Sequence, residues 1–591
     1  MNKTKNKLMP LMLLTAGILT FTGCTDSNYD FDKVDATMGF GGESIEIPFS
    51  STQEIPLEDI LELQQDGSVK TDADGNYLFQ LAGNEVEGAS PKITPIFLYG
   101  EAHPIDLTIF RTDNYSKLRS AIGTIEYTSN KEKMFQYSGR DKSIVDLQQA
   151  TVDEATLQVL FKTSYLSQAL DAVDQLTIRL PKFIDIESVT ADNGQRSFDN
   201  SVITISNIST ARDLNLAIKL KNLDFTKDKN DEYGSLYINK TNGDIDIEGF
   251  LRIGVKANIA RIPTDNLRLI AQISASSTTL RKATGIFDPD ININSLGEVN
   301  VTGIPDFLSE DDVVADVDNP VIILNVANNM DAAANITATI VSTKNGAELA
   351  RVDLPKMKIH KSSVRENTQI CICRKSTNSL TSQYGAENVY EVSNLSTLIQ
   401  RIPDHISIEN VKAQADLTQT AVIEFGKTYS VKPSYEIYAP LAFGEKANIV
   451  YTDTFKDWND DIKDLDLAEG TYIMVTANAE NKVPAYLTVT AYPIDAQGNE
   501  IKDKLTIEIP EKVQPSTDGE TAVTTPITMK ISAKEKNAFK SLDGLTFRIS
   551  GSASTEGEAS VTGVTLNAKK HSIKLNDIKI KIVGKVIGDF N

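Results

Sequence analysis

Alternation of apolar and polar residues at a period of two is the feature that most limits how this chain can fold. Successive side chains of a strand point to opposite faces, so this alternation is typical of strands with one buried face. It is clearest in four segments: "ATLQVLFKT" (155–163), "YLTVTAY" (486–492), "GLTFRIS" (544–550) and "DIKIKIVG" (577–584). In the last segment Ile578, Ile580 and Ile582 share one face. The sequence therefore predicts a mainly β protein.

Turn signals separate these runs, and helical patterns are few. Glycine-containing pairs mark turns at Asp74-Gly75, Asn242-Gly243, Asn345-Gly346, Gln497-Gly498 and Asp543-Gly544. The three short helical patterns cover 57–63, 167–173 and 394–400. Short strands divided by tight turns favour sandwich domains of about 100 residues. We therefore expect tandem β-sandwich modules, Ig-like or related, with few short helices.

Three proline-led segments align without gaps. They are "LPKFIDIESVTA" (180–191), "IPDFLSEDDVVA" (304–315) and "IPDHISIENVKA" (402–413). Proline removes a ladder donor and so marks a strand start or edge. We interpret each copy as the entry to one β-module, which predicts that Val189, Val313 and Val411 are buried at equivalent positions in separate sandwiches. Chance similarity among β-rich segments is the alternative.

A second pair of segments supports a modular chain. Residues 328–349 and 480–501 both predict a strand, a hairpin turn with glycine and a returning strand. In this alignment Asn329 matches Asn481 and Gly346 matches Gly498. Tandem sandwiches would contain such a connection more than once.

These patterns divide the chain into expected segments. The divisions are a signal peptide over 1–23, an acidic tether over 24–42, an N-terminal β-rich domain over 43–140, β-sandwich modules over 141–290 and 291–385, and a C-terminal β-sandwich region of one or two modules over 386–591. The length after the signal peptide suits about three to five domains.

The start of the chain predicts export. Lys3, Lys5 and Lys7 precede a short apolar run over 8–20, and small residues follow, which is the pattern of a secretory signal peptide. The apolar run is too short for a typical transmembrane helix. Phe21-Thr22-Gly23-Cys24 resembles the lipobox of bacterial lipoproteins. An ordinary signal peptide with an incidental cysteine is the alternative.

The lipobox resemblance implies a membrane anchor. In bacterial lipoproteins the cysteine thiol receives a diacylglycerol, the signal is cut before it, and the new amino terminus usually gains a third chain. Burial of each CH₂ contributes about 0.8 kcal/mol, so two or three chains hold a protein on a membrane durably. Acidic residues after the cysteine resemble a Bacteroidota signal for the outer face of the outer membrane. Asp26, Asp30 and Asp32 are spread out, which leaves the periplasmic face open as well.

Charge and cysteine content exclude some functions. The chain has 81 acidic and 59 basic residues, a net charge of −22, and an acidic chain repels phosphate backbones. We therefore expect no nucleic-acid partner.

Cys371 and Cys373 share one face of an expected strand. The favoured interpretation is that they pack there as two small apolar residues. A strained local disulfide and a metal site are the alternatives.

Searches for catalytic motifs find none of the common ones. The chain lacks Gly-x-Ser-x-Gly, His-Glu-x-x-His, Gly-x-Gly-x-x-Gly and a Walker loop. We expect no cofactor, no bound metal and no catalytic residue. The candidate ligand-binding residues are Trp458, the single tryptophan, with Asp457, Asp460 and Asp461 around it. An exposed indole among carboxylates would attract cations. Packing of Trp458 as a plug on a sandwich end is the alternative.

Taken together, the lipobox, the acidic tether and the repeated β-modules resemble the uncharacterised multi-domain β-sandwich lipoproteins of Bacteroidota. The resemblance implies a lipid-anchored protein of the outer membrane, on its inner or outer face. It favours a non-catalytic role in binding, adhesion or assembly, with an envelope protein or a glycan as the partner. A polysaccharide-processing enzyme or its accessory glycan-binding protein is the alternative.

Overall fold

The computed structural model describes residues 44–587, apart from short gaps. The gaps are 49–50, 62, 65–66, 84–87, 113–121, 294–295, 306–307, 309–311, 387, 460–465, 468–469 and 585. The expected signal peptide and tether, and with them Cys24, therefore lie outside the described residues.

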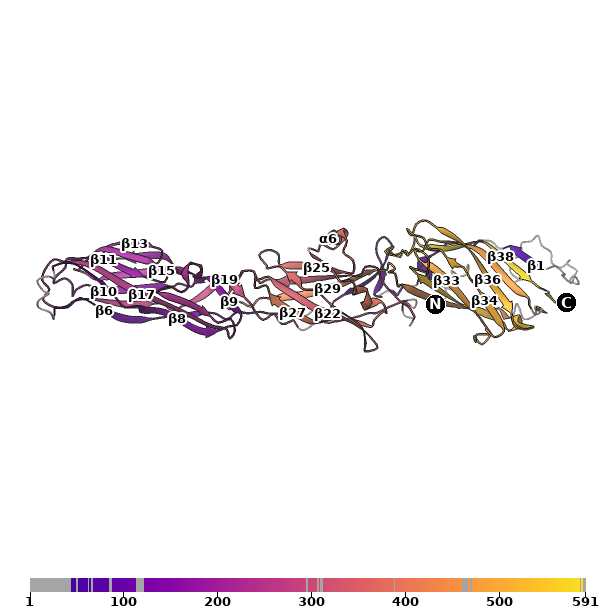
Figure 1. Cartoon of the computed structure of the whole chain (residues 1–591), viewed down its shortest axis with the longest axis horizontal. Helices are drawn as coiled ribbons and strands as arrows, with labels where there is room; N and C mark the ends of the chain where they lie inside the picture. Colours follow the sequence, from indigo (N-terminus) through magenta and orange to yellow (C-terminus); the bar gives the residue numbers. More distant parts are fainter. Residues whose placement is uncertain are drawn as a thin grey trace.

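The described chain forms a rod of three β-sandwiches placed end to end (Figure 1). This arrangement confirms the mainly β fold class and the expectation of several sandwich modules. The helices are short: α2 (Leu57–Ile60), α4 (Phe225–Asp228), α6 (Asn378–Tyr384) and the 3₁₀ turns η2 (Leu395–Ile399) and η3 (Ala538–Ser541). The helical pattern over 167–173 forms turns instead. No described helix is long and apolar enough to cross a membrane.

The first sandwich is a jelly roll, with two sheets whose strand order follows from the pairing. Its strands are, in chain order, β6 (Ala102–Phe110), β7 (Gly123–Thr128) with β8 (Glu132–Arg140), β10 (Thr156–Lys162), β11 (Ala172–Arg179), β14 (Val202–Ser209), β15 (Leu214–Asp224), β17 (Asp244–Ile259) and β18 (Leu267–Ala275). If these are lettered B to I, one sheet runs B-I-D-G and the other C-H-E-F. This is the double-sheet order of a jelly roll rather than the ABED and CFG order of an immunoglobulin domain.

Additional strands widen the first jelly roll. β12 (Ile184–Ala191) extends the first sheet beyond β15, while β13 (Gln195–Asp199) and β16 (Gly234–Ile238) extend the second. Four strands join the first jelly roll to the next: β5 (Phe97–Gly100), β9 (Ile144–Val152), β19 (Thr278–Phe287) and β28 (Ala421–Glu424).

The second jelly roll repeats the same order. Its strands B to I are β4 (Tyr77–Ala82), β20 (Glu298–Asn300), β21 (Val321–Asn328), β22 (Ala334–Lys344), β23 (Ala347–Asp353) with β24 (Met357–Ile359), β25 (Asn367–Cys373), β27 (His405–Ala415) and β29 (Val431–Pro440). β3 (Val69–Thr71) and β26 (Asn388–Glu391) lie at the two edges of its B-I-D-G sheet.

The third jelly roll has this order too. Its strands B to I are β1 (Ser44–Pro48), β30 (Asn448–Phe455), β32 (Tyr472–Asn481), β33 (Tyr486–Ile494), β35 (Lys512–Val513), β36 (Val523–Ala533), β37 (Gly544–Ser552) and β38 (Ser572–Val583). The remaining strands are β2 (Ile55–Pro56), β34 (Leu505–Glu508), β31 (Asp466–Leu467) and β39 (Val586–Ile587).

The N-terminal segment supplies strand B to every jelly roll. β1 pairs with β38 in the third, β4 with β29 in the second and β6 with β18 in the first. The expected separate domain over 43–140 is therefore wrong, because its strands are distributed over three sheets. The boundary expected at 385 is wrong as well, because β21 pairs with β29 across it. The chain runs the length of the rod and then folds each sandwich on its way back (Figure 1).

The proline-led motifs do not mark equivalent positions. The first copy forms β12, the third forms β27, and Val313 of the second lies outside the strands. All three valines are buried, as expected, but Val313 and Val411 lie in the same continuous core. The interpretation of the three segments as equivalent module entries is therefore wrong.

The junctions between jelly rolls are packed like their interiors. One hydrophobic core continues from the second jelly roll into the third through Val317, Leu441, Phe443 and Leu566. The core of the first jelly roll includes Tyr429, which the chain supplies from the second. The core shared by the second and third jelly rolls opposes bending between them, since bending would expose apolar surface. The first jelly roll has a separate core.

Candidate functional sites

The loop around Trp458 is organised by a buried carboxylate. Asp543 accepts hydrogen bonds from the backbone N–H groups of Asp457 (3.3 Å) and Asn459 (3.0 Å), and its own carbonyl accepts from Trp458 N–H (2.9 Å). The indole is only 6% exposed and belongs to the core shared by the second and third jelly rolls. Trp458 is therefore buried, although its acidic surroundings indicated an exposed indole. It packs as a plug, which is the alternative interpretation.

The carboxylates expected beside Trp458 are not assembled into a site. Asp457 is exposed, with a positive φ of 72°, while Asp460 and Asp461 lie outside the described residues. Among the residues that the structure describes, no group of three or more His, Cys, Asp or Glu side chains is placed to hold a metal ion. Ligand binding by this loop stays a prediction.

Cys371 and Cys373 are buried, free thiols. They lie on β25 in a small apolar cluster with Val321, Ile323 and Leu380 of α6. Burial raises the pKa of the Cys371 thiol to about 12, which keeps it protonated and unreactive at neutral pH. The structural interpretation of these cysteines is confirmed.

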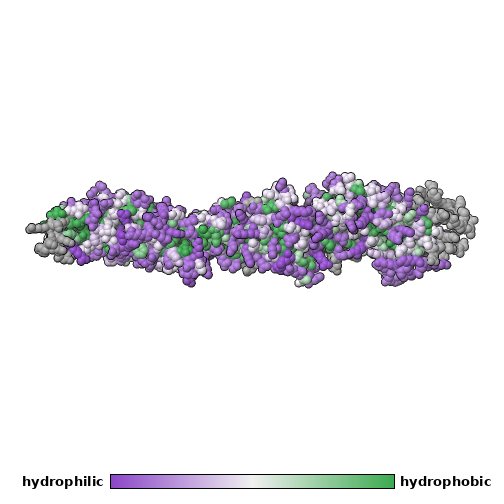
Figure 2. Space-filling model, viewed as in Figure 1, coloured by the Kyte–Doolittle hydropathy of each residue, from purple (hydrophilic) through white to green (hydrophobic). Residues whose placement is uncertain are grey.

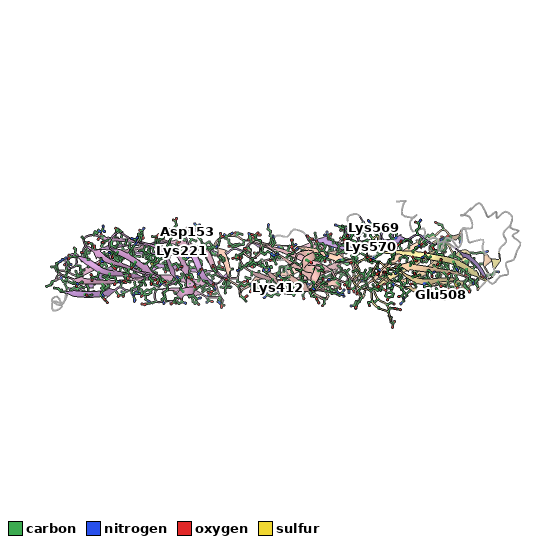
Figure 3. The ribbon with its side chains drawn as sticks, turned by 90° about the horizontal axis from the view of Figure 1, so that it is seen from above. Asp153, Lys221, Lys412, Glu508, Lys569 and Lys570 are labelled. Atoms are coloured by element: carbon green, nitrogen blue, oxygen red, sulfur yellow. The ribbon has the colours of Figure 1, made fainter. Side chains whose placement is uncertain are left out.

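The four histidines are separated along the rod. His103 contacts Glu132 at 3.3 Å, and His405 contacts Glu298 at 2.9 Å, both near the surface. His571 is buried, and its Nδ1 accepts a hydrogen bond from the Asn567 N–H (3.0 Å). Labelled charged side chains are likewise spread over the rod (Figure 3).

An apolar cavity of about 90 Å³ lies between the two sheets of the third jelly roll. Ala477 and Ala479 line it where larger side chains would fill the space. Glu511 is its one charged lining residue, and that carboxylate accepts the Thr528 N–H (3.0 Å). The cavity offers little to orient a polar ligand, and we interpret it as a packing void.

A second hollow, of about 610 Å³, lies on the outer face of the first jelly roll. Its floor is formed by four adjacent strands, β12, β15, β10 and β18. The side chains that face outward are uncharged amides and hydroxyls with two small apolar residues between them: Gln158, Leu160, Thr190, Asn215, Ala217, Gln272 and Ser274. We call this hollow the outer groove. The sequence pattern identified these positions only as the polar side of strands.

Comparisons with known proteins give little further information. No protein-family model matches the sequence, and no curated protein matches it. One similar solved structure is a putative secreted protein from Parabacteroides distasonis, with a TM-score of 0.36 and 16% identity over 51% of this chain and 89% of that one. Another is from "The Triple Jelly Roll Fold and Turret Assembly in an Archaeal Virus", with a TM-score of 0.10 and 7% identity over 85% of this chain and 99% of that one. Scores this low carry no functional argument, and the jelly rolls rest on strand order alone.

Proposed function

We propose that this protein is a lipid-anchored, non-catalytic protein of the cell envelope whose rod holds the first jelly roll away from the membrane for binding, adhesion or assembly. The observation that carries the proposal is the path of the chain. β1 and β38, near the two described ends, pair in the third jelly roll, and the first jelly roll lies at the opposite end (Figure 1).

The position of Cys24 in the sequence supports attachment at the third jelly roll. Ser44 of β1 lies 20 positions after Cys24, and a fully extended chain of that length spans at most about 70 Å. Three jelly rolls with strands of about ten residues reach on the order of 100 Å end to end. A lipid on Cys24 therefore anchors the rod by its third jelly roll.

Stiffness and surface chemistry support a spacer role. The shared core opposes bending between the second and third jelly rolls, and paired strands join the second to the first. On the face shown in Figure 2, hydrophobic residues lie in separate spots among hydrophilic ones, as expected for a rod that stands in water. The outer face of the outer membrane and the periplasm are both compatible with this arrangement.

Two measurements test the proposal. First, the full-length protein and Cys24→Ser are partitioned between detergent and water. Wild type should enter the detergent phase and the variant should not, and equal partitioning of both would exclude the anchor.

Second, epitope tags are inserted at Gly194 in the first jelly roll and at Gly557 in the third, both exposed turns. Antibody labelling of protein reconstituted in a supported bilayer should place the Gly194 tag farther from the bilayer. Tags at equal height would contradict a standing rod.

A further inference from the structure

The outer groove lies on the jelly roll that is farthest from the proposed anchor. Its side chains form two rows across the sheet. Asn215, Leu160 and Gln272 are register partners in one row, and Thr190, Ala217, Gln158 and Ser274 in the next. Neighbouring strands are about 4.8 Å apart, so each row places side chains of adjacent strands within contact distance.

Two of the three amides in these rows are available for a ligand. Gln158 and Gln272 are exposed, and neither side chain has a hydrogen-bond partner among the described residues. Each side-chain amide can donate two hydrogen bonds and accept two. Leu160 and Ala217 lie between them as half-buried apolar positions. The groove therefore alternates polar and apolar contacts over a short distance.

The groove has one charged lining residue, the exposed Asp192, and each of its carboxylate oxygens accepts one hydrogen bond from Asn215. Oδ1 accepts the Asn215 backbone N–H (2.8 Å), and Oδ2 accepts the Asn215 side-chain amide (2.7 Å). The lining contains no lysine or arginine, so the groove offers phosphates, sulfates and carboxylates no cationic partner.

An aromatic side chain lies beyond one end of the groove. Tyr165 is 49% exposed, and the Arg268 guanidinium carbon lies 5.9 Å from its ring centroid. Arg268 and Gln272 project from the same face of β18, because their positions differ by four, an even number. Four residues of strand span about 13 Å, and Lys162 of β10 is the register partner of Ile270 on that stretch, so the ring lies outside the uncharged part of the groove.

We propose that the outer groove binds a neutral glycan. This proposal rests on the proposed function and names the class of ligand for its binding role. Sugar hydroxyls both donate and accept hydrogen bonds, as the side chains of Gln158, Gln272 and Ser274 do. The C–H face of a sugar ring would pack on Leu160 and Ala217. This lining complements an uncharged ligand whose surface alternates between polar and apolar groups.

The test uses affinity electrophoresis of the full-length protein in detergent through gels that contain dextran, mannan, xylan, heparin or polygalacturonate. We expect retardation by at least one of the three neutral polysaccharides and none by the two acidic ones. Gln158→Ala/Gln272→Ala should weaken that binding about tenfold, a loss of about 1.4 kcal/mol.

Matched controls lie on the opposite sheet of the same jelly roll. Gln195→Ala removes an exposed amide from β13, and Tyr237→Ala removes an exposed ring from β16, so both should leave binding unchanged. Retardation by acidic polysaccharides alone, by none of the five, or equally for groove and control variants would overturn the proposal. These outcomes leave the Cys24→Ser and tag measurements unaffected, so failure of the groove and failure of the anchored rod are distinguishable.

Discussion

Asn328 and Asn481 occupy the same position in two jelly rolls. Each ends strand D, and each side-chain amide donates to the carbonyl four residues further on, Ala332 (3.1 Å) or Ala485 (3.1 Å). Each also donates to the carbonyl that follows strand F, that of His360 (2.9 Å) or Gln514 (2.9 Å). The two D-E connections are therefore equivalent, one residue out of register with the alignment that paired Asn329 with Asn481.

In the first jelly roll a threonine, rather than an asparagine, lies at the corresponding position after strand D. Thr163 follows strand D there, and its hydroxyl donates to the Arg212 carbonyl at 2.8 Å, with the carbonyl of Thr210, which follows strand F, 3.4 Å away. All three side chains are buried. A buried carbonyl without a partner is costly, so this position requires a side-chain donor in every jelly roll.

Replacing Asn481 should destabilise the third jelly roll. Asn481→Ala leaves the carbonyls of Ala485 and Gln514 and the N–H of Val483 without their partner, at about 1–3 kcal/mol for each buried group that stays unsatisfied. We expect a lower melting temperature in a thermal scan. Asn335→Ala, which removes a half-exposed amide from β22, should change stability by less than about 0.5 kcal/mol. Equal effects of the two variants would contradict the proposed role.

A buried ion pair holds the junction between the second and third jelly rolls. The Asp316 side chain is fully buried, contacts Arg374 Nη1 at 3.0 Å and accepts the Lys446 N–H at 3.0 Å. Arg374→Met leaves that carboxylate unpaired and should cost about 3–5 kcal/mol. Limited proteolysis should then cut near 441–447 faster than in wild type. Lys375→Met removes an exposed partner of Asp318 and should leave the cleavage rate unchanged.

The stability of the third jelly roll should fall between neutral and mildly acidic pH. Burial, with the nearby Lys570 charge, lowers the pKa of His571 to about 4. Unfolded His571 binds a proton below about pH 6.5 and the folded protein does not, so its contribution is complete above pH 6.5 and declines towards pH 4. The full decline is about 3 kcal/mol.

Urea unfolding at pH 7 and pH 5 measures this decline. His571→Gln keeps an amide oxygen as the acceptor for the Asn567 N–H and removes the titrating ring, so its stability should depend less on pH in this range. If the variant and wild type lose the same stability between these pH values, other groups cause the decline.

Filling the apolar cavity should stabilise the protein. A void of about 90 Å³ costs about 2 kcal/mol when it stays empty. Ala477→Val adds two methyl groups at its wall and should raise stability by about 1 kcal/mol. Ala439→Val makes the same change at a fully buried position of β29 away from the cavity, where overpacking should lower stability. A loss of stability in both variants would show that the cavity is already filled.

Local patterning was sufficient to predict strands but not their partners. The alternation in 577–584 predicted a strand whose Ile578 and Ile580 are buried, and β38 has that pattern. Nothing in the sequence indicated that β38 pairs with Ser44–Pro48. Any two alternating strands can form a ladder, so pairing across such a sequence separation is decided by the energy of the whole fold.

Composition and position indicated an exported, acidic, mainly β chain without common catalytic motifs. The sequence placed Trp458 in an acidic loop, but only the tertiary structure decided that the indole is buried, because burial depends on what Asp543 and the adjoining core bring to that loop. The outer groove likewise exists only after β10 and β18 become neighbours. The sequence by itself determined which residues form strands and which faces are polar, since these depend on near neighbours along the chain. The tertiary structure decided which polar faces meet, since that depends on contacts between residues far apart in sequence.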